Sequence, residues 1–241
     1  MKFFRSIRRN YLIKFKNIQY FKYAIGEIIL VVIGILIALQ LNNWDENRKL
    51  RKKEVFHIRN LVKEIQDNNR TFRNAIETDS INLIAEKKML SILKNRNSEY
   101  NDSMSYVFYT ILKPKPFENE SAAYESLKLD NANMIKSDSI RKSISICYGV
   151  VYPYFHNEHS KKSKEFLEPI KNIMLRSFER IEVNRIVPNN YEELKKDKSF
   201  TNALSFYILE RQILLYTKKS LYRYLEKYQL DLENYLTEIE N

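Results

Sequence analysis

Residues 24–41 read AIGEIILVVIGILIALQL, and the twelve residues from Ile28 to Leu39 include no polar or charged side chain. As a helix, the whole stretch is roughly 27 Å long, close to the ~30 Å hydrocarbon core of a bilayer. Buried helices of soluble proteins seldom carry so long an unbroken apolar run. The stretch therefore predicts one transmembrane helix, which we place at residues 23–43.

A cleaved signal peptide is the second interpretation of this stretch. Such a leader needs small residues at a cleavage site after its apolar region. The chain continues instead with Gln40, Leu41 and two asparagines, followed by Trp44, its only tryptophan. We therefore expect the helix to be retained. Trp44 is then an anchor at the membrane interface, where tryptophan is enriched.

Positive charge is concentrated before the apolar stretch. The net charge of the chain is +11, and residues 1–22 hold seven lysines and arginines and no acid. Five more basic residues follow the stretch, between Arg48 and Lys53. The positive-inside rule therefore favours a cytoplasmic amino terminus, by seven basic residues to five, with residues 44–241 outside the membrane.

Residues 1–22 also have an amphipathic helical pattern. Their apolar residues recur at steps of three and four: Phe4, Ile7, Tyr11, Phe15 and Ile18. A basic helix of this kind lies on an anionic leaflet with its aromatic rings in the interface. A cationic leader that only orients the span is the alternative, and the two roles are compatible.

Small and polar residues within the span are candidate functional positions. Gly26, Gly34 and Ala38 lie close to one helix face, and small residues on one face let two transmembrane helices approach closely. They predict a homo-oligomer formed through the span. Glu27 and Gln40 are polar positions near its two ends. An acid in a span is a functional candidate, although one this close to the boundary can also pair with a basic residue there.

The composition of residues 44–241 favours long helices. Gly149 is the only glycine in this region, and Cys147 is the only cysteine of the chain. Scarce glycine disfavours the tight turns of hairpins, and one cysteine excludes an internal disulfide. We expect Cys147 to be a small core residue. Lysines interleaved with acids fit solvated helix faces, so we expect no nucleic-acid partner.

Two long amphipathic helices are expected in this domain. The first continues past Trp44 and ends before the polar stretch 95–103. The second covers about residues 200–239, where apolar residues repeat at steps of 4-3-4-3-4, a spacing typical of coiled coils. The sequence therefore predicts an all-α fold with one amino-terminal transmembrane helix, followed by an elongated antiparallel helical bundle.

Shorter elements are expected between these helices. Residues 104–112 fit a helix or a strand, and a short helix is expected at about residues 118–129. Ser137 or Asp138 caps the next helix, which we expect to be kinked at Pro153. Pro169 is expected to open another helix.

Two motifs resemble those of a bacterial family of uncharacterised single-span membrane proteins. One is the span, with Gly26-Glu-Ile near its start and Leu39-Gln-Leu-Asn-Asn-Trp44 at its end. The other is Tyr124-Glu-Ser-Leu-Lys128 followed by Asn131-Ala-Asn-Met-Ile135. The resemblance implies a location in the bacterial cytoplasmic membrane and a helical domain after the span. It implies no reaction.

The sequence contains no P-loop, dinucleotide fingerprint, nucleophile elbow or HExxH motif. The nearest cluster is His156, Glu158 and His159, in which two histidines at i and i+3 share a helix face and could bind a metal. Two ligands do not make a metal site, so we interpret these residues as a weak polar cluster. We expect no enzymatic activity and no cofactor.

Three functions are compatible with these features. The first is a membrane-anchored scaffold or partner-binding protein of the bacterial envelope, in contact with the lipid bilayer and with an envelope protein. The second is an extracytoplasmic ligand-sensing bundle that signals through a partner. The third and least favoured is an enzyme. An exposed apolar stripe over a solid apolar core would favour the first, and a buried polar pocket between helices the second.

Overall fold

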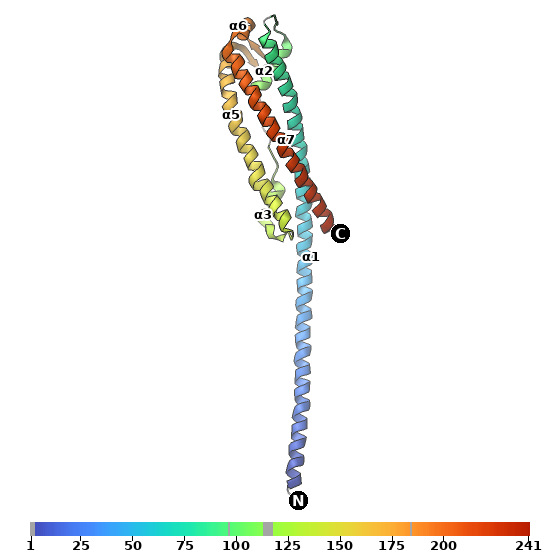
Figure 1. Cartoon of the computed structure of the whole chain (residues 1–241). Coiled ribbons are helices and arrows are strands. Elements are labelled where there is room, and N and C mark those ends of the chain that lie inside the picture. The colour runs from blue at the N-terminus through green and yellow to red at the C-terminus, as the bar shows by residue number, and fades with distance from the viewer. Residues whose placement is uncertain (1–2, 96, 113–117, 184) are drawn as a thin grey trace. The chain divides into compact units, whose positions relative to one another are not determined.

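The computed structural model describes residues 3–95, 97–112, 118–183 and 185–241, and leaves out the side chains of residues 3–24, 158–160, 162–163 and 180–181. The described chain is almost entirely helical (Figure 1), so the predicted all-α class is confirmed. It divides into two units, residues 1–53 and 54–241. Each unit is described by itself.

The first unit consists of the amino-terminal part of helix α1. This helix begins at Phe3 and ends at Lys94. Its segment around the apolar stretch is the one described helix that is long and apolar enough to cross a membrane. All described side chains from Ile25 to Leu50 are exposed. The prediction that the helix continues past Trp44 to about residue 94 is confirmed.

The second unit contains the rest of α1 and ten further elements. In chain order they are α2 (Asp102–Leu112), α3 (Ala122–Asp130), the 3-10 helix η1 (Ala132–Met134), α4 (Asp138–Ile146), the π-helical turn η2 (Cys147–Val151), α5 (Tyr152–Ser177), β1 (Phe178–Glu182), β2 (Arg185–Pro188), α6 (Tyr191–Lys196) and α7 (Lys198–Glu240).

Helices α1 and α7 run antiparallel along this unit. Arg59 bonds Glu240 at 2.7 Å, Gln66 bonds Glu233 at 2.8 Å, and Lys87 bonds Gln212 at 2.8 Å. As the residue numbers rise along α1, the numbers of their partners on α7 fall, as expected for antiparallel helices. Helix α7 also packs against α5 (Figure 1). The predicted antiparallel bundle of long helices is confirmed.

Two apolar cores stabilise the second unit. The first joins the middle of α1, the segment α3–η2, the start of α5 and the carboxyl-terminal half of α7, with Leu61, Tyr152 and Leu232 at its centre. The second joins the end of α1, α2, α5, the two strands and the first half of α7, around Phe108 and Phe200. Each fully buried side chain of this size contributes about 1.5–3 kcal/mol.

The structure differs from two local predictions near prolines. Pro169 lies inside α5 and does not open a helix, so that prediction is wrong. Its neighbours Phe166 and Ile170 are buried in the second core, and this packing outweighs the cost of a proline in a helix, about 3 kcal/mol. Near Pro153, where we expected a kink, the structure has the π-helical turn η2, which directly precedes the turn of α5 that contains this proline. Proline lacks the N–H that a continuing helix uses, which accounts for an irregular turn at this place.

The hairpin β1–β2 was not predicted, because scarce glycine argued against hairpins. Its strands pair antiparallel, with Glu182 opposite Arg185 and Phe178 opposite Pro188. The Ser105 hydroxyl of α2 donates to the Ile186 carbonyl at 2.9 Å and accepts from its N–H at 2.8 Å. Packing on α2, which adopts the helical alternative for residues 104–112, therefore stabilises the hairpin.

Candidate functional site

The candidate residues of the span are all exposed in the described unit. A Cβ added at Gly26 or Gly34 would meet no atom within 4 Å, so the chain's own packing does not require glycine there. Ala38, Glu27 and Gln40 are exposed as well. A homo-oligomer through this face stays a prediction.

Trp44 is 63 % exposed, and the Arg48 guanidinium lies 5.8 Å from the centre of its ring. An amphipathic aromatic ring beside a cation is suited to the headgroup region of a membrane. This geometry is compatible with the role of Trp44 as an interface anchor.

Of the three residues in the predicted polar cluster, His156 is the one whose side chain the structure describes. His156 on α5 bonds the Asn119 side-chain oxygen at 2.8 Å, so it links α5 to the segment before α3. The side chains of Glu158 and His159 lie outside the described residues. Among the described residues, no group of three or more histidines, cysteines, aspartates and glutamates is placed to hold a metal ion.

Cys147 is fully buried in the first core, as predicted. Burial raises the pKa of its thiol from 9.0 to about 12. The thiol is therefore protonated at neutral pH, and a protonated thiol is neither a good nucleophile nor a good metal ligand.

Four buried polar side chains form one face of α1, which we call the α1 polar face: Glu54, His57, Glu64 and Asn68. The spacing of these residues along α1 follows the helical repeat, so they point to the same side of the helix. Buried polar groups are costly unless they are hydrogen-bonded, so their partners show what this face does.

The α1 polar face holds the segment from residue 118 to residue 138. Asn68 donates to the Glu120 carbonyl at 2.9 Å and accepts from its N–H at 2.8 Å. Glu64 accepts from the Ala123 N–H at 2.6 Å, at the amino terminus of α3, where backbone N–H groups lack helical partners. The Tyr148 hydroxyl also donates to Glu64, at 2.6 Å.

The other two residues of this face hold the far end of the same segment. His57 contacts the Asp130 carboxylate at the end of α3, at 3.0 Å. Glu54 accepts from the Lys136 N–H at 2.7 Å, just before α4, and from the Tyr235 hydroxyl at 2.5 Å. The two stretches 124–128 and 131–135, which form the second motif of the sequence analysis, thus lie in a segment that α1 contacts at both ends.

In the sequence, Asn68 stands out as a polar residue in an apolar stripe with steps of three and four, formed by Ile58, Leu61, Ile65 and Phe72. The other three residues look like ordinary charged positions of a solvated helix. The signal that could have found them is their spacing, because Glu54, His57 and Glu64 fall in step with Leu61 and Asn68 at intervals of three and four. Those intervals match the core-facing stripe of a helix.

An ionic cluster joins α1 to α7, and we call it the ionic layer: the half-buried Asp79 and the buried Glu86, Arg211 and Lys218. Asp79 on α1 bonds Lys218 at 2.5 Å and Arg211 at 3.2 Å, both on α7. Arg211 also donates to the Tyr207 hydroxyl at 2.8 Å, and that hydroxyl donates to the Ile111 carbonyl of α2 at 3.1 Å.

Of the four residues of the ionic layer, Glu86 has the weakest interactions with its neighbours. Its carboxylate is fully buried, and Arg211 lies 3.2 Å from one of its oxygens as an ion pair without hydrogen-bond geometry. Burial, with a smaller contribution from Asp79, raises the pKa of Glu86 from 4.5 to about 7, while Arg211 acts in the opposite direction. The ionisation state of this layer therefore changes close to neutral pH.

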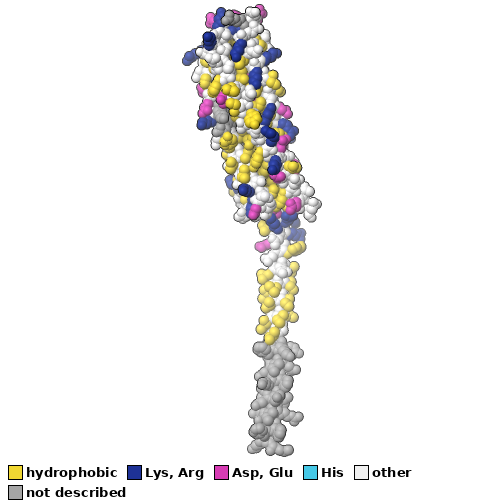
Figure 2. Space-filling view, in the orientation of Figure 1, with side chains coloured by type: hydrophobic (Ala, Val, Ile, Leu, Met, Phe, Trp, Pro, Cys, Tyr) yellow, Lys and Arg dark blue, Asp and Glu magenta, His cyan; other side chains and the backbone are white. Residues whose placement is uncertain are grey.

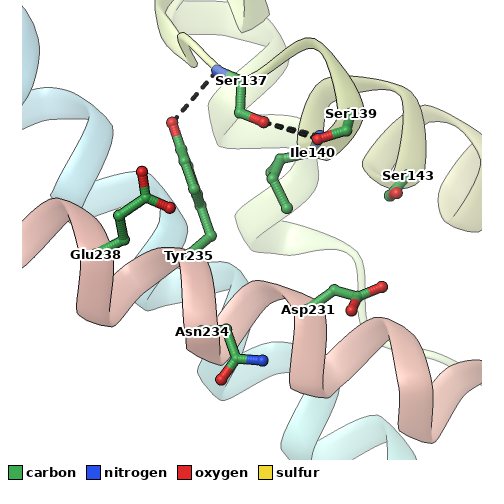
Figure 3. A pocket seen from close by; sticks show the side chains of 8 residues that line it. All are labelled: Ser137, Ser139, Ile140, Ser143, Asp231, Asn234, Tyr235 and Glu238. Atoms are coloured by element: carbon green, nitrogen blue, oxygen red, sulfur yellow. Dashed lines mark hydrogen bonds between the residues drawn. The ribbon is translucent and has the colours of Figure 1, made fainter.

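A shallow groove of about 370 Å³ lies between α4 and α7 (Figure 3). Its base includes Tyr235, whose hydroxyl accepts from the Ser137 N–H at 3.3 Å. Hydroxyl groups line its α4 side, and Asp231, Asn234 and Glu238 line its α7 side. These three are exposed to solvent, so water already satisfies the groups that a ligand would have to bind.

The outer face of α7 carries an exposed apolar stripe, which we call the α7 stripe: Phe206, Leu209, Ile213 and Tyr216. These side chains are 42–71 % exposed and are spaced 3-4-3, whereas Tyr207, Arg211 and Leu214 between them are buried. Figure 2 shows hydrophobic side chains along the face of the bundle on which α7 runs. An exposed apolar stripe at helical spacing is typical of a surface that contacts another protein.

Comparison with known protein families, curated proteins and solved structures gives no match to this chain. The resemblance of the span and of the 124–135 region to a single-span family stays a prediction.

The pairing of Asn68 with the Glu120 backbone is open to test. We expect Asn68→Ala to remove both hydrogen bonds between this side chain and the Glu120 backbone, and to destabilise this region by about 1–3 kcal/mol. Hydrogen exchange of the detergent-solubilised chain, read by mass spectrometry, would then be faster in residues 118–130. Gln66→Ala, which removes an exposed bond to Glu233, is the control. Equal exchange in the two variants would contradict this role of Asn68.

The raised pKa of Glu86 predicts a pH dependence of stability. Between pH 4.5 and about 7 the folded chain binds this proton more tightly than the unfolded chain, so the stability from Glu86 is complete at low pH and falls as pH rises. The limiting slope is about 1.4 kcal/mol per pH unit. We expect Glu86→Gln to remove this slope in chemical unfolding measured from pH 5 to 8.

The exposed residue Glu77 lies on the same helix and supplies the control. Glu77→Gln should keep the slope of the unsubstituted chain. A slope that persists in Glu86→Gln would show that another group titrates.

Proposed function

We propose that this protein is a membrane-anchored helical scaffold that binds a protein partner in the bacterial envelope. The observation that carries the proposal is the α7 stripe. Its four side chains lie on the face of α7 opposite the two cores, where they contribute little to folding. Folding stability alone does not require apolar residues at such positions, because a side chain that stays exposed gains little from folding.

The rest of the second unit supports a scaffold. It has two apolar cores, and each of the four residues of the α1 polar face contacts another part of the chain. Binding in the interior would require the loss of such contacts. Binding on the outer face of α7 requires none.

In this proposal, the apolar segment of α1 is the membrane anchor. It is long and apolar enough to cross a membrane, and its side chains are exposed. The excess of basic residues before it favours a cytoplasmic amino terminus and an extracytoplasmic bundle. The resemblance of the span to single-span bacterial proteins supports the cytoplasmic membrane as the location.

A ligand sensor is the second candidate function, and the groove of Figure 3 favours it. Hydroxyl and carboxylate groups on opposite walls suit a cationic or polyhydroxylated ligand. The groove is shallow and its acidic residues are solvated, so the α7 stripe is the stronger observation.

Topology is the first part of the proposal to test. Fusions of alkaline phosphatase and of a fluorescent protein that matures only in the cytoplasm would be placed after Asn241 in a bacterial host. We expect phosphatase activity without fluorescence, because the seven basic residues of segment 1–22 stay inside. Fluorescence without phosphatase activity would place the bundle in the cytoplasm and contradict the proposed orientation.

Partner binding by the α7 stripe is tested with a photoreactive amino acid in the full chain. We expect adducts in living cells from position 209 and from position 213. The same residue at position 175 is a matched control, because Leu175 on α5 is 56 % exposed and Leu209 is 53 % exposed. Adducts absent from the α7 positions, or equally strong at position 175, would contradict the proposal.

A further inference from the structure

The α7 stripe has the spacing of a short coiled-coil seam. Phe206 and Ile213 occupy a positions, and Leu209 and Tyr216 occupy d positions. The residues of the inner face, Tyr207 and Arg211, belong to the buried side of the same helix. Helix α7 therefore packs into its own bundle on one side and presents a second seam on the other.

We propose that the α7 stripe binds the α7 stripe of a second copy of this chain, with the two helices parallel and in register. This inference rests on the proposed function and names the partner. It is distinct from an oligomer formed through the small residues of the span, because its contacts lie in the bundle.

The charges beside the seam distinguish the two directions of self-pairing. In a parallel pair, e and g residues of the two helices face each other, so Glu210 at e lies beside the Ser205 hydroxyl at g of the partner copy. Likewise Gln212 at g lies beside Thr217 at e. These flanking contacts bring no like charges together.

An antiparallel pair centred on the same stripe brings like charges together at its middle. Two copies of Glu210 then face each other, and the side chain of Glu210 is half-buried, so water screens the repulsion only in part. In the parallel pair, like charges come together only at the two copies of Arg223, the next d position beyond the stripe. Arg223 is exposed, so this contact is screened and marks the end of the seam.

The proposed anchor holds two copies of the chain in one membrane. The seam is short, with one and a half heptads, which alone is marginal in water. Tethering to one membrane raises the effective concentration of the second copy and compensates for this.

Cysteine crosslinking of the full chain in liposomes tests the inference. The background is Cys147→Ala, checked for native helicity by circular dichroism, with single cysteines as Phe206→Cys, Tyr216→Cys and Leu175→Cys. With a short bismaleimide, we expect at least tenfold more crosslinked dimer from each of the two stripe positions than from position 175.

The end positions of the stripe separate the two directions. In an antiparallel pair, equal positions at either end lie about 15 Å apart along the axis, and only mixtures of Phe206→Cys with Tyr216→Cys chains would crosslink. That pattern would overturn the parallel arrangement. In the parallel case, adding Ile213→Glu to Phe206→Cys should abolish the dimer, whereas adding Leu175→Glu should not. A dimer that survives Ile213→Glu would overturn the role of the stripe.

The outcome also separates this inference from the proposed function. If purified chains in liposomes give no crosslink while position 209 captures a different envelope protein in cells, self-pairing is wrong and partner binding stands. If neither experiment gives a specific product, both are wrong.

Discussion

The removal of two carboxylates from water, Glu54 and Glu64, is the constraint on which the first core depends. Each accepts a backbone N–H and a tyrosine hydroxyl, from Tyr235 and Tyr148 respectively. A buried carboxylate with fewer donors would cost several kcal/mol. The segment 118–138 must therefore lie where its N–H groups reach α1, and the positions of α3 and α4 follow from that requirement.

Polar contacts also set the register of the long helices. Apolar stripes spaced at three and four allow two helices to slip by a heptad at modest cost, since leucine meets leucine again. A slip would separate Asp79 from Lys218 and Arg211 and leave charges buried without partners. The ionic layer thus fixes which turn of α1 faces which turn of α7.

The sequence was sufficient for the long elements. The apolar run, the 4-3-4 spacing of the last helix and the polar stretch after residue 94 predicted α1 and α7, because these signals repeat over many residues. Short elements depend on contacts far away in the chain: Pro169 stays in α5 and the β1–β2 hairpin forms through burial in the second core. The α1 polar face was missed because composition does not reveal which charged residues are buried.

The distribution of side chains on α7 bears on what this bundle is for. Its inner face buries Arg211 and Lys218, and its outer face exposes Phe206, Leu209 and Ile213. Exchanging apolar and polar residues between these faces would remove the desolvation cost of the charges and add buried apolar area, so folding stability alone does not account for the arrangement. The inner charges fix the register of the bundle. The outer stripe lowers the free energy only when another surface covers it, and that dependence is the physical argument for a partner.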